Sequence, residues 1–195
     1  MSEPTSTNVI AGPAQLYIAP VGTAAPPVTG SSEWPIVWPG GWVEAGYTDS
    51  GIDFTYTPTL KSWTPDEEAS PVYDILQAEK FELTATLGEA TLANYQSAIS
   101  ASSIATDATN GVIKVSTGSQ ALNYVSLGAA GPAPFGAGST AAKGRMLIVQ
   151  KAIAGSAIAY KMTRKDVVKF AVKWEARKIA GQDLYDLYEF TSAAS

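Results

Sequence analysis

The chain shows a clear alternation of apolar and polar residues in three separate stretches. They read GIDFTYT (51–57), KFELTATL (80–87) and DVVKFAVKWEARK (166–178). A period of two places successive side chains on opposite faces of a strand, so each stretch predicts a β-strand with one buried and one wet face. We expect the first two strands to pair antiparallel. The buried faces would carry Ile52, Phe54, Tyr56, Phe81, Leu83, Ala85, Leu87, Val168, Phe170, Val172 and Trp174.

Weaker patterns complete the element list. A continuous apolar centre in RMLIVQKAIA (145–154) predicts a strand that is covered on both faces. Apolar spacing through Leu92, Tyr95 and Ile99 predicts an amphipathic helix of about three turns over 89–99. The sum is about eight strands and one flanking helix, a mostly β fold of the sandwich or partly open barrel type, in a single domain over 1–195. Further short strands are expected at 14–22, 112–117, 124–128, 157–162 and 183–190, and a mobile tail at 1–8.

Two connections rich in proline, glycine and alanine stand out. Residues 23–41 carry Trp34 and Trp38, and we expect this loop to fold onto the core. A carbohydrate-binding module that uses Trp34, Trp38 and Trp42 is the open alternative. Residues 128–144 predict an exposed loop, and they lack the phosphate-binding pattern G-x-x-x-x-G-K-[ST].

The segment 58–79 between the first two strands is longer than a normal hairpin loop of about 2–5 residues. Ordering about 20 residues costs about 1–2 kcal/mol each, whereas burying each large apolar side chain returns about 1.5–3 kcal/mol. The few such residues do not balance that cost in an isolated chain. We therefore predict an extended arm that is mobile alone and ordered against neighbouring chains.

The composition narrows the possible chemistry. The chain has no cysteine and no histidine, which excludes disulfides, thiolate zinc sites and Ser-His or Cys-His catalysis. The densest carboxylate group is Asp66, Glu67 and Glu68, but consecutive residues of an extended segment point in alternating directions. A paired-carboxylate glycosidase is therefore disfavoured, and we predict no catalysis and no cofactor or metal.

Charge is unevenly distributed around a net value of −5. Residues 1–100 hold 12 acidic and 2 basic side chains, and residues 101–195 hold 6 and 11. This division is typical either of two solvated surfaces in a soluble domain or of a protomer with oppositely charged faces that attracts copies of itself. The basic stretch 161–178 could bind nucleic acid, but its Phe170 and Trp174 share the apolar face and are expected in the core. No apolar run reaches the roughly 20 residues of a membrane span and the start is unlike a signal peptide, so we expect a soluble protein made in the cytoplasm, without membrane insertion.

The order of these elements resembles the major tail tube proteins of long flexible-tailed phages, particularly those of actinobacteria. The resemblance covers the strand, long arm, returning strand and helix of residues 47–99 and the closing strands of 160–190. It implies a virion protein whose copies form hexameric rings, assembled in the host cytoplasm and stacked into a hollow tube for the genome. It also implies partners in the tape measure and tail-end proteins, and viral DNA passing transiently through the lumen.

Carried onto this chain, the resemblance implies roles for two sets of residues. The arm 58–79 would contact an adjacent subunit, and the polar strand faces beside it would line the lumen. A distal tail, tail terminator or type VI secretion tube-like ring protein is the related alternative. The arm contacts would be Pro58, Trp63, Pro65, Asp66, Glu67, Glu68, Val72 and Tyr73, and the lumen residues Asp53, Thr55, Thr57, Glu82, Thr84 and Thr86.

Overall fold

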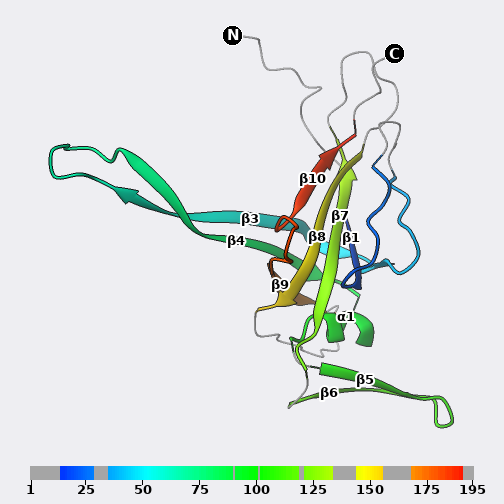
Figure 1. The fold of residues 1–195 in the computed structure, drawn as a ribbon. Coiled ribbons are helices and arrows are strands. Elements are labelled where there is room, and N and C mark those ends of the chain that lie inside the picture. Colours follow the sequence, from blue (N-terminus) through cyan, green and yellow to red (C-terminus); the bar gives the residue numbers. More distant parts are fainter. Residues whose placement is uncertain are drawn as a thin grey trace, which may run out of the picture.

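A computed structural model describes residues 14–28, 35–89, 91–100, 102–118, 121–133, 144–155 and 168–190. Antiparallel strands dominate these residues, as the sequence predicts, and one long hairpin projects from the body (Figure 1). The predicted tail 1–8 and strand 157–162 lie outside the described residues. The elements are β1 (Gln15–Pro20), β2 (Val43–Glu44), β3 (Thr48–Trp63), β4 (Tyr73–Leu87), α1 (Leu92–Ser97), β5 (Ser102–Asp107), β6 (Val112–Thr117), β7 (Tyr124–Pro132), β8 (Gly144–Ala154), β9 (Phe170–Ala176) and β10 (Asp186–Glu189).

The main sheet has the strand order β2-β1-β7-β8-β9-β4-β3, with β10 paired to β8. Its first and last strands, β2 and β3, are consecutive in the chain and are joined by residues 45–47 alone. The sheet therefore folds back on itself without closing. Backbone hydrogen bonds fix this junction, from Ala45 N–H to the Leu16 carbonyl (2.8 Å) and from Gly88 N–H to the Tyr47 carbonyl (2.8 Å).

The main core lies between the two halves of the folded sheet. On β4 the side chains from Phe81 to Leu87 alternate between buried and half-buried, and on β9 Phe170, Val172 and Trp174 are each 1% exposed. These faces pack against apolar residues of β1, β7 and β8. The predicted alternation of the two strands is confirmed, and Phe170 and Trp174 are core residues.

A second core covers the opposite face of β1, β7 and β8. It contains Met146 and Ile148 of β8, whose neighbours Leu147 and Val149 belong to the main core. Strand β8 is thus buried on both faces, as its continuous apolar centre predicts. The cover comes from the segment before β2, through Ile36, Trp38 and Trp42, and from Phe190.

The stretch 128–144 differs from the predicted exposed loop. Gly128–Pro132 belong to β7 and Gly144 begins β8; residues 134–143 lie outside the described residues. The lack of a side chain matters for packing at Gly128, where an added Cβ would lie 2.2 Å from Cη2 of Trp38. Only a residue without a side chain leaves room for the indole above this strand.

The single predicted helix is shorter than expected and presents a different face. Helix α1 spans six residues, begins after the N-cap Thr91 and buries Asn94 and Ser97. Leu92, predicted on the apolar face, is 42% exposed. Both buried side chains form hydrogen bonds: Asn94 Nδ2 donates to the Ala45 carbonyl (2.9 Å), and the Ser97 hydroxyl donates to the Asn94 carbonyl (2.7 Å). The backbone carbonyl of Ser97 accepts from Trp174 Nε1 (3.1 Å).

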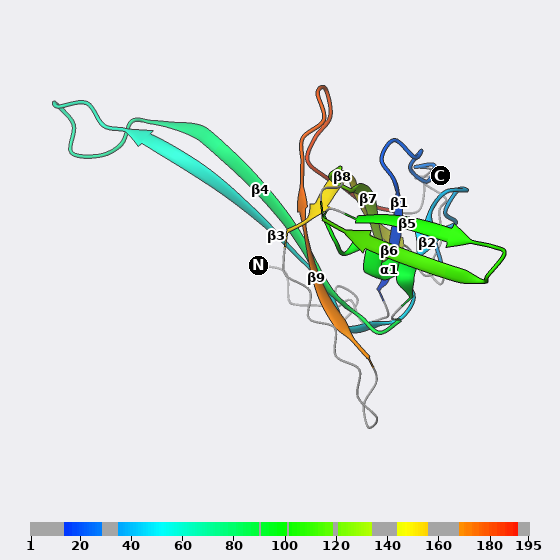
Figure 2. The same ribbon diagram turned by 90° about the horizontal axis from the view of Figure 1, so that it is seen from below.

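A separate two-stranded sheet, β5–β6, follows α1. It leaves the body on the side opposite to the long hairpin (Figure 2). The sequence predicts β6 but not β5, whose residues SSIATD lack a regular alternation. The turn is fixed by Asp107 Oδ1, which accepts the N–H groups of Thr109 (3.0 Å) and Asn110 (3.1 Å).

Candidate functional site: the projecting hairpin and the polar face at its base

The projecting hairpin consists of β3 and β4, which run without interruption from the core into the arm (Figure 1). Pairing continues from Thr48↔Leu87 at the base to Trp63↔Tyr73 near the tip. Only residues 64–72 lie outside the strands. The predicted arm 58–79 is therefore mainly a two-stranded ribbon rather than an irregular segment. Pro58 fits because β3 is the last strand of the sheet, where a missing N–H can face away from β4.

The arm is exposed along nearly its whole length. Of the predicted contact residues, Trp63, Val72 and Tyr73 are 57%, 55% and 63% exposed, and Pro65 is half-buried. The structure adds three large apolar side chains that the site prediction omitted. They are Leu60, Ile75 and Leu76, all about half exposed, and the recurrence of apolar residues in TLKSW and YDILQ is the signal that could have identified them.

The acidic triplet Asp66, Glu67 and Glu68 is exposed at the tip. Within the described part of the chain, no basic side chain forms an ion pair with it. The backbone makes a turn there, with Glu68 N–H donating to the Pro65 carbonyl (3.2 Å). No cluster of acidic residues suited to a metal ion occurs among the described residues.

The predicted lumen residues lie on one face of the sheet at the base of the arm. Asp53 pairs with Thr84, and Thr55 with Glu82, so their side chains share a face. Thr57 lies opposite Lys80, and Thr86 lies opposite Asp49 before a β-bulge. In this bulge Gly51 adopts φ +83°, a conformation that favours glycine.

Strand β9 extends this polar face and changes its charge. Lys173 Nζ lies 2.6 Å from Glu82 Oε1, and Lys80 Nζ lies 2.8 Å from the same oxygen. Glu175 contacts Lys80 (3.4 Å) and Arg177 (2.9 Å). Lys169 and Asp49 form a further ion pair (3.0 Å) at the end of the face nearest the bulge.

The ion pairs shift the pKa values of the carboxyl groups. Hydrogen bonds from Lys173 and then Lys80 hold the pKa of Glu82 below its usual value, and Arg177 does the same for the pKa of Glu175. Both side chains are consequently negative at neutral pH and paired.

The polar face is charge-balanced rather than acidic. Its acidic residues are Asp49, Asp53, Glu82 and Glu175, and its basic residues are Lys80, Lys169, Lys173 and Arg177. The carboxylates of β3 and β4 are balanced by Lys80 of β4, by Lys173 of β9 and by Lys169 and Arg177, which flank β9. Part of the basic stretch 161–178 is accordingly paired within its own chain.

Trp38 and Trp42, the described tryptophans before β2, do not form an exposed binding platform. Trp42 is 8% exposed and donates its Nε1–H to the Ala24 carbonyl (2.8 Å). The Trp38 ring is stacked on that of Tyr17, at 4.3 Å between ring centroids, and lies 4.8 Å from the tilted ring of Trp42. Both fold onto the core, as the first interpretation of this loop predicts, and Trp34 lies outside the described residues.

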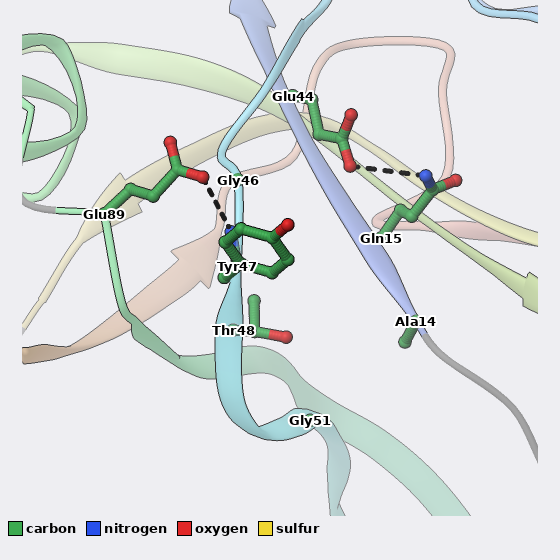
Figure 3. Close-up of a pocket in the computed structure, with 8 residues that line it drawn as sticks. All are labelled: Ala14, Gln15, Glu44, Gly46, Tyr47, Thr48, Gly51 and Glu89. Carbon is green, nitrogen blue, oxygen red and sulfur yellow. Dashed lines mark hydrogen bonds between the residues drawn. The ribbon is translucent and has the colours of Figure 1, made fainter.

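A cleft of about 610 Å³ lies beside the junction of β1, β2 and β3 (Figure 3). Two carboxylates line it, and each already accepts a hydrogen bond from the chain. Gln15 Nε2 donates to Glu44 (3.3 Å), and the N–H of Tyr47 donates to Glu89 (3.3 Å). Figure 3 shows Glu44 and Glu89 turned toward these separate partners.

Comparison with known proteins assigns the chain to a family. A search of curated proteins finds no match. Among the described residues, no helix has the length and apolar character needed to cross a membrane. The family model described as phage tail tube protein matches residues 1–194. The chain therefore belongs to the phage tail tube proteins, which are non-enzymatic structural components of the virion tail.

Proposed function

We propose that copies of this chain assemble edge to edge into closed rings, which stack into a tube that conducts the phage genome. The observation that carries this proposal is the outer edge of β3. This strand is the last of the sheet, and among the described strands it pairs only with β4. A long free edge invites pairing with another strand, and ring closure leaves no edge exposed. Six-fold symmetry, a long flexible tail and an actinobacterial host follow from the resemblance.

In this assembly the polar face of β3, β4 and β9 lines the channel. Every cation on it lies beside a carboxylate, so the face offers passing phosphate groups no unpaired positive charge. The threonines add hydroxyl groups without charge. DNA would thus be neither held nor strongly repelled. Tape measure and tail-end proteins are the further partners that the resemblance implies, with assembly in the host cytoplasm.

The arm supplies the contact with an adjacent subunit. Its apolar side chains, about half exposed in the single chain, would be buried on the neighbour. The acidic triplet Asp66, Glu67 and Glu68 would pair with basic residues there. Because salt screens exposed ion pairs, we expect the assembly to become less stable at high ionic strength.

Electron microscopy of the purified protein tests assembly directly. Rings or tubes with a central channel support the proposal, and discrete monomers at all concentrations contradict it. Trp63→Ser should prevent tube formation while the single chain stays folded. Val37→Ser is the matched control. Val37 is 83% exposed, but it lies outside the arm, in the segment that covers the second core.

Cysteine labelling tests which face lines the channel. The chain has no cysteine of its own, so Thr55→Cys and Val37→Cys each create a unique thiol. In assembled tubes Thr55→Cys should react with a small maleimide but not with one attached to a bulky polymer, whereas Val37→Cys should react with both. Equal reaction of Thr55→Cys with the bulky reagent before and after assembly would contradict the lumen assignment.

A further inference from the structure

A bulge in β4 changes which side chains share a face about halfway along the arm. Thr59 pairs with Ala78, but the next residue of β3, Leu60, pairs with Leu76. Gln77 is therefore the extra residue that has no partner in β3. An extra residue in one strand shifts its alternation by one position, so β4 side chains exchange faces at this point.

Beyond the bulge, large apolar side chains occupy both faces of the ribbon. Leu60 and Leu76 lie opposite each other on one face and are 58% and 49% exposed. Trp63 and Tyr73 form a pair on the other face, which also carries Ile75. We call the side with Leu60 and Leu76 the leucine face, and the side with Trp63, Tyr73 and Ile75 the aromatic face.

The two faces differ from the parts of the same ribbon that lie nearer the body. The leucine face continues the side that carries Phe81 and Leu83, which are buried in the core. The aromatic face continues the charge-balanced side that carries Lys80 and Glu82. The side of the ribbon that is charged and polar at the base is therefore apolar in the projecting part. There the chain's own core does not cover it.

We propose that the distal arm is inserted between two other copies of the chain, with the leucine face covered by one copy and the aromatic face by another. This inference rests on the proposed self-assembly. Because a two-stranded ribbon is a single layer, one neighbouring surface can cover only one of its two faces. The apolar side chains of the other face would stay exposed to water. Two covering surfaces remove both exposed apolar faces.

Charge indicates which part of the other copies meets the arm. Residues 60–79 hold one basic side chain, Lys61, and five acidic ones, so two arms repel each other. Residues 101–195 hold 11 basic and 6 acidic side chains. The distal arm therefore fits against this second half of the chain in the two other copies rather than against their arms.

The first measurement is protection of single thiols. Leu60→Cys reports on the leucine face and Ile75→Cys on the aromatic face, each as a trace component in excess unmodified chain, so that the unmodified chain carries assembly. Both thiols should react with a small alkylating reagent about tenfold or more slowly in tubes than in the dissociated chain. A thiol on either face that reacts equally fast in both states overturns the inference.

The second measurement counts the copies. Leu60→Cys/Ile75→Cys places photoreactive maleimide probes on opposite faces, and Leu60→Cys/Leu76→Cys places them on one face as a matched control. After trace incorporation and irradiation, the opposite-face pair should give three-chain products and the same-face pair two-chain products. Two-chain products from both pairs, or three-chain products from both, overturn the inference. Failure of the unmodified chain to form rings or tubes is a different result, and it rejects the proposed function itself.

Discussion

The contact between Gly128 and the Trp38 indole provides the sharpest stability prediction. A Cβ at position 128 would lie 2.2 Å and 2.3 Å from two ring atoms of Trp38, and 3.1 Å from Trp42. These atoms belong to rigid rings: Trp38 is stacked on Tyr17 and contacts the tilted ring of Trp42. Gly128→Ala must therefore displace the Trp38 ring from the second core.

The magnitude follows from two opposing effects. Overpacking a well-packed site costs about 1–3 kcal/mol, and the closeness of the contact favours the upper end. Replacing glycine by alanine in a strand returns about 0.5–1 kcal/mol of chain entropy. The net loss in the free energy of unfolding is then about 2 kcal/mol, which corresponds to a Tm lower by about 4–8 °C for a chain of this size.

Chemical and thermal unfolding of the unassembled chain, followed by tryptophan fluorescence, measures this loss. Gly40→Ala is the matched control, because Gly40 lies in the same covering segment and an added Cβ meets nothing within 4 Å. Trp38→Leu should cost much less in the Gly128→Ala background than in the wild type, with a coupling of about 1–2 kcal/mol. An unchanged Tm for Gly128→Ala, or additive effects of the two substitutions, would refute the reasoning.

Three further predictions concern polar contacts. Because its lysine partners hold the pKa of Glu82 below 4.5, the stability from this carboxylate is present above about pH 4.5 and is lost as pH falls through the lower folded-state pKa. Thermal unfolding at decreasing pH should show a shallower acid loss for Glu82→Gln than for the wild type. Trp174→Phe leaves the Ser97 carbonyl without its buried donor and should lower the unfolding free energy by about 1–3 kcal/mol in urea titration, unlike exposed Trp63→Phe. Asn94→Ala removes the side-chain donor to Ala45 and should cost a similar amount by the same assay; no change would mean that water replaces it.

The strands of the core could be predicted because burial acts on every second residue. In β4 and β9 the residues that face the core are apolar without exception from Phe81 to Leu87 and from Phe170 to Trp174. The continuous apolar run of β8 likewise reflects cover on both faces. In these elements the local pattern and the tertiary environment agree.

Other features depend on contacts between distant segments, which a local pattern does not record. The buried Asn94 of α1 is polar because its side chain donates to the Ala45 carbonyl on another segment. Gly128 and its neighbours form a strand through pairing with β1 and β8, and a tryptophan far away in sequence covers them. The charge balance of the polar face likewise depends on a distant segment, because Lys173 reaches Glu82 from β9.

The strands of the arm could not be predicted, because their sequence has the features of a loop. Its prolines and acidic residues indicate a loop, but cross-strand pairing continues to Trp63 and Tyr73. The Gln77 bulge breaks the alternation of β4, so a period of two is lost in the sequence although the strand persists. The candidate contact residues Trp63, Val72 and Tyr73 could be recognised because large apolar side chains are conspicuous in a polar segment.

The continuity of β4 has a mechanical consequence. The strand whose outer half lies in the arm is the same strand whose inner half, Glu82–Leu87, pairs with Phe170–Glu175 of β9. Antiparallel hydrogen bonds lie perpendicular to the strands, so a pull along the arm stresses the whole ladder in shear instead of opening it one pair at a time. Tension applied at the tip of the arm would thus be transmitted directly into the most buried part of the protein.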